Sequence, residues 1–324
     1  MAAAAAAAAP EKPEQTAKLL LINAHMFMRV TVGCTNMASE PVHCIRMCGG
    51  DPTAAMQLLA TSSMASGLVQ WALNPTFGKL SDRYGRRPFL LVGPIWNTLG
   101  NFLIAMNPNN RLAFAVLRVI GKTLQTLSGS TTSMAALSDC ASGDRLTFWS
   151  AWLGSAACVG VILGGWIETA ILAVRGVDAT QTVFLTMSAM GAVHTLMVAL
   201  FLKETLPLDE RKTDPPRFQS PLGMFKLFTN GQALRLAALS CGFACFADGA
   251  NLNDIDQMWI KSDVDDMGMA ANSVYLTLWG FAGSFSGVIV PGLLKSLGSR
   301  GFTTLTNATN ALAMILWGGI PFGA

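Results

Sequence analysis

Charged residues are scarce in this sequence. Of its 324 residues only 13% are Asp, Glu, Lys or Arg, whereas 52% are apolar, and the charges lie between apolar runs. A helix that crosses a bilayer needs about 20 apolar residues at roughly 1.5 Å per residue, and most of these runs have about that length. The composition therefore disfavours a soluble domain and predicts an all-α polytopic membrane protein in contact with the lipid bilayer.

Motifs for catalysis or metal binding are also lacking. The sequence contains no Gly-x-Ser-x-Gly elbow, no HExxH pair and no phosphate-binding glycine loop. Its three histidines, His25, His43 and His194, lie in separate segments without a metal-ligand spacing. The net charge of +3 is small, and the basic residues do not form one continuous face. We therefore expect no enzyme, no cofactor, no metal site and no nucleic-acid partner.

The apolar runs predict about nine membrane spans, at residues 17–37, 53–77, 89–106, 111–137, 147–172, 181–202, 233–249, 271–290 and 302–322. Residues 1–16 combine an alanine tract with prolines and charges and lack the basic start of a secretory signal, so they predict a disordered cytoplasmic lead. We expect an amino-terminal six-helix bundle at 17–203, a cytoplasmic linker at 204–232 and an incomplete carboxy-terminal bundle of three helices at 233–324.

The distribution of basic residues predicts the orientation. With the amino terminus inside, 15 of the 22 Lys and Arg residues fall on the inner side, four on the outer side and three within spans. Basic residues in short loops mark the cytoplasmic side. We therefore expect a cytoplasmic amino terminus, and we use "inner" for this side below.

The stretch Gly78–Leu91, which reads GKLSDRYGRRPFLL, forms a tight charged loop between the second and third spans. Its glycines allow close backbone approach or a positive φ. Its acid, Asp82, can form an ion pair or contact a helix end and so hold a bundle shut. The candidate gating residues are Gly78, Asp82, Arg83, Gly85, Arg86 and Arg87.

The order Gly-x-Leu-x-Asp-Arg-x-Gly-Arg-Arg in this stretch resembles the signature loop between helices two and three of the major facilitator superfamily. Shifted by 213 residues, Gly85 falls on Gly298 and Arg87 on Arg300, within PGLLKSLGSRGF. Such a repeat is typical of a duplicated six-plus-six transporter. The resemblance implies a major facilitator fold in which the copies of helices four, five and six are missing from the second half. We interpret the chain as a fragment or an open form of that fold.

The segment LSDCASGDRLTFWSAWLGSAACVGVILGG is similar to the loop and fifth helix of the drug-exporter branch, which includes the tetracycline-efflux proteins. In this alignment Gly160 and Gly164 match glycines of the antiporter motif, whereas Glu168 and Thr169 replace later glycines. Small residues at four-residue spacing let membrane helices pack closely, so we expect such a contact at Gly160 and Gly164. KETLP, at the end of the sixth span, resembles the same branch.

Four residues mark a candidate pathway for the solute or for protons: Arg29, Arg118, Lys122 and Gln125. Arg118 matches an arginine that in these families is thought to assist proton transfer, although Lys122 stands where the family has glycine. The candidate intramembrane acids, Glu168 and Asp248, lie toward the outer ends of their spans. Three buried cations therefore predict an acid that reaches inward, an acid on a missing helix, or an anionic solute.

Two functional interpretations stay open. The first is secondary active transport of a small organic solute by alternating access, with proton-coupled efflux as its narrower form. The second is a non-transporting membrane sensor or assembly partner on the same scaffold, or an inactive truncated transporter. Transport measurements separate them.

Overall fold

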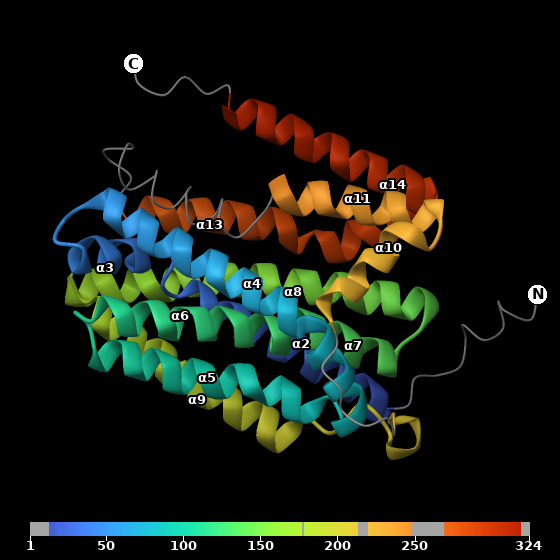
Figure 1. Ribbon diagram of the computed structural model, residues 1–324, viewed down its shortest axis with the longest axis horizontal. Helices are drawn as coiled ribbons and strands as arrows, with labels where there is room; N and C mark the ends of the chain where they lie inside the picture. The colour runs from blue at the N-terminus through green and yellow to red at the C-terminus, as the bar shows by residue number, and fades with distance from the viewer. Residues whose placement is uncertain (1–12, 177, 213–219, 248–268, 319–324) are drawn as a thin grey trace, which may run out of the picture.

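The computed structural model describes residues 13–176, 178–212, 220–247 and 269–318, and within these ranges it consists of helices without a strand. The long helices lie side by side (Figure 1). Those of the first half are α2 (Pro13–Cys34), α4 (Pro52–Tyr84), α5 (Arg87–Met106), α6 (Arg111–Thr126), α8 (Gly143–Arg175) and α9 (Thr180–Phe201). The second half contains α11 (Gln232–Ala247), α13 (Met269–Ser284) and α14 (Ser286–Gly318). Each predicted span thus contains a helix, and the all-α fold is confirmed.

Length and apolarity differ among these helices. In the described part of the chain three of them, α5, α8 and α9, are long and apolar enough to cross a membrane. A bent pair of helices at 273–284 and 288–312 counts as a fourth candidate if the two are taken together as one span. The two members of that pair meet at 47°. Polar side chains within α2 and α4 lower their hydropathy, and such side chains inside a membrane protein normally face other helices.

The first span is broken. It was expected to end near residue 37 and to be followed by a polar outer loop. Instead α2 ends at Cys34, and a second helix, α3 (Ser39–Met47), begins after a four-residue break. His43 and Cys44 of α3 are buried, so the outer half of this span packs into the bundle. The prediction of a loop here was wrong because this polar segment folds as a helix with one buried face.

The fourth span continues from α6 through a π-helical turn, η2 (Leu127–Thr131), into α7 (Thr132–Cys140). π-Turns within α-helices occur frequently at functional sites. Here Gly129 leaves space for a neighbour, since a Cβ on it would lie 2.7 Å from Nε of Arg29. The π-turn thus provides the surface against which the Arg29 guanidinium packs.

The signature stretch is mostly helical. α4 continues to Tyr84 and α5 begins at Arg87, so only Gly85 and Arg86 lie between them. Gly85 has φ 96° and ψ 165°. Gly298, its counterpart in the second copy, has φ 67° and ψ 170° inside α14. Two glycines with the same unusual backbone at corresponding places support the internal repeat.

The core of the first half has three layers. An inner apolar cluster includes Leu19, Leu90 and Val198, and an outer apolar cluster includes Val32, Phe114, Leu172 and Phe184. Between these clusters α2, α5, α6 and α9 carry polar side chains, namely His25, Arg29, Asn97, Arg118, Lys122, Gln125 and His194. The apolar clusters hold the helices together and enclose this polar layer.

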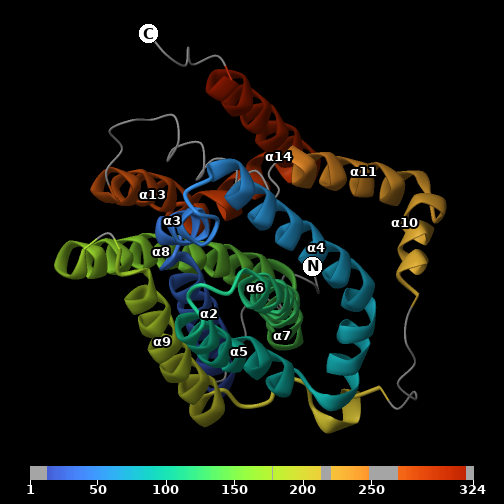
Figure 2. The same cartoon turned by 60° about the vertical axis from the view of Figure 1, so that its left-hand side comes forward.

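The helix pairs α2–α8 and α5–α9 pack along their lengths, and α8 also contacts α13 and α14 of the second half. Both views show α13 next to α8, while α10 (Lys226–Thr229) and α11 stand farther from the first six spans (Figure 2). The fifth span therefore connects the two halves. The predicted linker includes the short helices η3 (Leu208–Glu210), η4 (Pro221–Phe225) and α10. At the amino terminus, α2 includes the last four residues of the expected lead.

Candidate functional site

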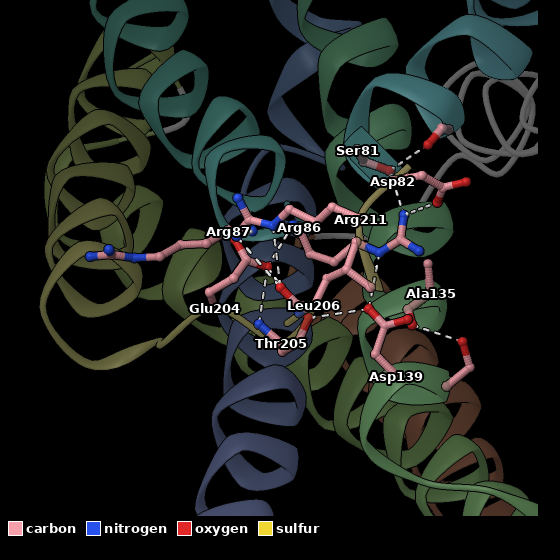
Figure 3. Close-up of polar contacts among 12 residues, drawn as sticks. Ser81, Asp82, Arg86, Arg87, Ala135, Asp139, Glu204, Thr205, Leu206 and Arg211 are labelled. Carbon is pink, nitrogen blue, oxygen red and sulfur yellow. Dashed lines mark hydrogen bonds and ion pairs between the residues drawn. The ribbon is translucent and has the colours of Figure 1, made fainter. Parts of the chain in front are cut away.

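The inner ends of α4, α5 and α7 meet at one arginine. Arg86 is 8% exposed and lies 2.6 Å from Oδ1 of Asp82 and 3.0 Å from Oδ2 of Asp139 (Figure 3). Its Nη1 also donates to Oγ of Ser81 at 2.7 Å. A guanidinium presents several donors in a fixed plane and can serve two carboxylates at once. Arg86 thus connects the ends of α4 and α7.

Glu204, just after α9, completes this cluster. Its Oε1 accepts the backbone N–H of Arg86 at 2.7 Å, and its Oε2 accepts that of Arg87 at 3.3 Å. These are among the first amides of α5, where the helix dipole favours a negative charge. Glu204 was not among the predicted site residues, although it belongs to KETLP, the segment that resembles the drug-exporter branch.

The linker also folds back onto this site. Nζ of Lys212 lies 2.5 Å from Oδ2 of Asp82, and the backbone N–H of Lys212 donates to the Asp82 carbonyl at 3.2 Å. Burial alone raises the pKa of Asp82, but the hydrogen bonds from Lys212 and Arg86 outweigh it, so the pKa is lowered. The Asp82 carboxylate is therefore charged at neutral pH.

The structure separates the predicted gating residues into two groups. Asp82, Gly85, Arg86 and the backbone of Arg87 meet in the cluster, and the Arg87 side chain donates to the Ala199 carbonyl of α9. Gly78 lies inside α4 with no atom within 4 Å of a Cβ built on it, and Arg83 lies over the Tyr84 ring at 5.6 Å. Close backbone approach is thus needed at Gly85 and not at Gly78.

Replacing Gly85 by alanine tests the geometry of the cluster. Gly85 has a positive φ, and a Cβ there would overlap Oε2 of Glu204. We expect Gly85→Ala to lower the stability by about 1–3 kcal/mol, which thermal unfolding of the purified protein measures. Gly78→Ala is the matched control and should unfold like the wild type. Equal melting temperatures for the two variants would contradict this packing.

Arg118, in the polar layer, joins three helices. Its Nε and Nη2 approach the Glu40 carboxylate at 3.1 and 3.4 Å. Its Nη1 donates to the Leu59 carbonyl at 3.0 Å and to Oγ of Ser62 and Ser63, each at 2.7 Å. Arg118 is 4% exposed, so its side chain connects α3, α4 and α6 inside the protein.

Glu40 is the acid that the sequence reasoning missed. It was assigned to an outer loop, but α3 carries it inward to Arg118. An acid that reaches inward was one of the three predicted ways to neutralise the buried cations. It applies to Arg118, but the acid is Glu40 and not Glu168 or Asp248. Asp248 lies outside the described residues.

Three of the predicted pathway residues line one cavity. Arg118, Lys122 and Gln125 border a space of about 100 Å³ together with Asn97 and Glu40. Nε2 of Gln125 donates to Oδ1 of Asn97 at 2.6 Å, and Nζ of Lys122 donates to Ser63 at 2.8 Å. Sites for drug-sized ligands measure about 300–1,000 Å³. This cavity is therefore too small for a drug-sized solute.

Arg29 is not among the residues that line the cavity. Its Nε and Nη2 approach Sδ of Met26 at 3.4 and 3.2 Å, and in the described part of the chain no carboxylate pairs with it. Beside it lie two buried histidines, with Nε2 of His194 2.9 Å from Nδ1 of His25. These histidines are 169 residues apart, and no sequence pattern predicts that they lie together.

Gly160 and Gly164 lie against α2. A Cβ on Gly160 would be 2.8 Å from the Phe27 carbonyl oxygen, and one on Gly164 would be 2.6 Å from that of Thr31. A Cβ on the next glycine, Gly165, would lie 3.1 Å from Cδ1 of Leu276 on α13. Small residues thus let α8 approach both the first span and the second half.

Residues 26–324 match the family model described as Major Facilitator Superfamily, and the chain belongs to this family of transporters. It is accordingly a multi-pass integral membrane protein, and the family supports a non-enzymatic transporter. The tetracycline resistance protein of class B from Escherichia coli is 27% identical over 165 residues, which are 48% of this chain and 39% of that protein. The class C protein of Escherichia coli is 25% identical over 182 residues, or 54% and 42%.

The fold also has a solved counterpart. The crystal structure of the human organic anion transporter MFSD10 (TETRAN) superposes with a TM-score of 0.66 at 18% identity, covering 89% of this chain and 76% of that one. At this identity the likeness shows the fold alone. The chain spans about two fifths of the length of the two tetracycline resistance proteins it matches.

Proposed function

We propose that this protein moves a small organic solute across a membrane by alternating access, with its amino terminus on the cytoplasmic side. The observation that carries the proposal is the position of Arg86 between Asp82 and Asp139, where the inner ends of three helices meet. Lys212 of the linker also joins this cluster through Asp82, and ion pairs at helix ends can break and re-form while the apolar packing elsewhere is kept. The cluster therefore serves as an inner gate.

The solute site lies between the two halves in this proposal. The cavity beside Arg118 is formed within the first half alone, and its size suits water or a small ion rather than an organic molecule. Alternating access exposes a site near the bilayer midplane, between two rocking bundles. The chain matches proteins that are named for tetracycline resistance, and its fifth span resembles that of the drug-exporter branch, so we propose efflux coupled to protons.

We further propose that the solute carries a negative charge. Arg29 lies within the first span, and its described contacts are to the Met26 thioether rather than to a carboxylate. A charge without a partner inside the membrane is costly, and an anionic solute would remove that cost as it binds. The anion would also gain charge-assisted hydrogen bonds from the guanidinium.

The experiment compares solutes of different charge on one molecular framework. Benzoate, benzamide and benzylamine share a ring and are anionic, neutral and cationic, and tetracycline is added because of the relatives' names. In proteoliposomes we expect the anion to be carried best and Arg29→Gln to lower its flux about 10- to 100-fold, the effect of losing one charged hydrogen bond. Lys122→Gln is measured beside it.

The control is Arg46→Gln, because Arg46 pairs with Asp178 at the exposed outer surface and lies outside the proposed pathway. That variant should transport benzoate like the wild type. Best transport of benzylamine, or unchanged benzoate flux in both Arg29→Gln and Lys122→Gln, would contradict an anionic solute.

A further inference from the structure

The buried carboxylate of Glu168 has no part in the sites described so far. It is 2% exposed and lies on α8, at a position where the related antiporter motif has glycine. Its Oε1 accepts the backbone N–H of Ala38 at 3.1 Å and that of Ser39 at 2.6 Å, and its Oε2 accepts from Ala38 at 3.0 Å. Both amides belong to the start of α3, directly after the break in the first span.

The break creates a need for such an acceptor. The first amides of a helix have no partner within the helix, and inside a membrane water does not replace one. The nearby hydroxyls do not supply a cap, because Oγ1 of Thr35 donates back to the Thr31 carbonyl and Oγ of Ser39 is a buried atom without a described partner. The cap therefore comes from another span, as a negative charge at the positive end of α3.

We propose that Glu168 is a proton-binding site that controls the break in the first span. The ionised carboxylate holds the start of α3 against α8. When it takes a proton from a hydronium ion, an O–H bond of that ion breaks, water is released and an O–H bond forms on the carboxyl group. The protonated oxygen then no longer accepts a backbone N–H, and the charge that strengthened the remaining bonds is neutralised. α3 is then held less tightly.

A movement of α3 would act directly on the polar layer. α3 also carries Glu40, which pairs with Arg118 at 3.1 Å, and Arg118 lines the cavity. A movement of α3 that withdraws Glu40 would free Arg118 from its carboxylate. Proton binding at the outer part of the fifth span would thereby alter the charge balance of the fourth. This link to transport rests on the proposed function, whereas the proton site itself does not.

The other titratable and charged groups on the elements around Glu168 have described positions. They are Glu14, Lys18, His25, Arg29 and Cys34 on α2, Glu40, His43, Cys44 and Arg46 on α3, and Tyr275 on α13. Those of α3 are directed elsewhere: Glu40 to Arg118, His43 to Oγ1 of Thr180 at 3.1 Å, and Arg46 to Asp178. α13 carries no carboxylate, amine or imidazole, and contributes the Ser273 hydroxyl. A pH response of the break therefore has Glu168 as its nearest source.

Hydrogen exchange measures this directly in the purified protein. The readout is the protection of the amides at residues 35–47 between pH 5 and pH 8, after correction for the intrinsic exchange rate, with residues 180–201 of α9 as the internal reference. In the wild type we expect protection at 35–47 to fall about tenfold or more as the pH is lowered, because a charged hydrogen bond is lost. Protection in α9 should not follow it.

Two substitutions separate charge from shape. Glu168→Gln should show weak protection at 35–47 at every pH, and Glu168→Asp, which keeps a carboxylate, should retain a pH response. Asp144→Asn is the control and should keep the response, because Asp144 is an exposed acid at the other end of α8. The proposal is overturned by pH-independent protection in the wild type, or by equal behaviour of the Gln and Asp variants at Glu168. If the wild-type protein shows this exchange pattern but carries no solute, the transport proposal is overturned and the proton site at Glu168 is not.

Discussion

Leucine at Gly164 should remove most of the correctly folded protein from the membrane. A Cβ at this position would lie 2.6 Å from the Thr31 carbonyl oxygen and 3.0 Å from the Cys34 backbone carbon. Both are backbone atoms of the first span, so they cannot turn away as a flexible side chain would. Extra methylenes in a packed core cost about 1–3 kcal/mol, and leucine adds four carbons where even one is too close. The α2–α8 contact should therefore open.

The measurement is the fraction of detergent-solubilised protein that elutes as a single symmetric species in size-exclusion chromatography. Gly67→Leu is the control, because Gly67 lies in α4, is exposed, and has no atom within 4 Å of a Cβ built on it. It should behave like the wild type. A monodisperse and fully active Gly164→Leu protein would show that this face of α8 does not pack against α2.

Asparagine at Asp82 should reduce turnover about tenfold or more while leaving the amount of protein in the membrane nearly unchanged. Asp82 contacts Arg86 at 2.6 Å and Lys212 at 2.5 Å, and the neutral amide loses the charge in both contacts. A hydrogen bond to a charged group contributes about 1.5–3 kcal/mol. The bundle should still fold, because Arg86 keeps its contact with Asp139 at 3.0 Å.

Initial flux per molecule of protein at the membrane is the quantity to compare. Asp178→Asn is the matched control, since Asp178 pairs with Arg46 on the exposed outer surface, where an ion pair contributes little. Its flux should equal that of the wild type. Normal turnover by Asp82→Asn would remove Asp82 from the gating mechanism, even if the cluster in Figure 3 is intact.

The helical fold could be predicted from the sequence because each span is a local pattern. Apolar runs near 20 residues give the helices, and a glycine beside two arginines indicates the turn at Gly85, where φ is 96°. The ends of the helices were harder to predict. Lys79, Ser81 and Asp82 interrupt the apolar run, yet polar residues form helices as readily outside the membrane, so α4 continues to Tyr84.

The partners of the charged residues could not be predicted in the same way. Glu40 is 78 residues from Arg118, Glu204 is 118 residues from Arg86, and Lys212 is 130 residues from Asp82. Glu40, Glu204 and Lys212 lie in segments that composition alone assigns to loops or to the linker. Their contacts depend on how the helices cross, which apolar periodicity does not specify.

At Glu168 the sequence departs from the glycine pattern of the antiporter motif, and this departure pointed to a functional residue. The sequence reasoning noted that it replaces a glycine, but a glutamate alone does not reveal its acceptor role. That role follows from the break after Cys34, which leaves the Ala38 and Ser39 amides to be capped. A polar residue that replaces a packing glycine inside a span is therefore a reason to look for unpaired backbone amides nearby.

Solute counterflow tests the transport proposal most directly. Proteoliposomes are loaded with unlabelled benzoate or tetracycline and diluted into a trace of the labelled solute, with no ion gradient and no energy source. Alternating access predicts that labelled solute accumulates transiently above its external concentration, and that the overshoot is slower and smaller in Asp82→Asn and unchanged in Asp178→Asn. Absence of an overshoot with every solute that binds the wild-type protein would contradict the account and favour a non-transporting membrane protein.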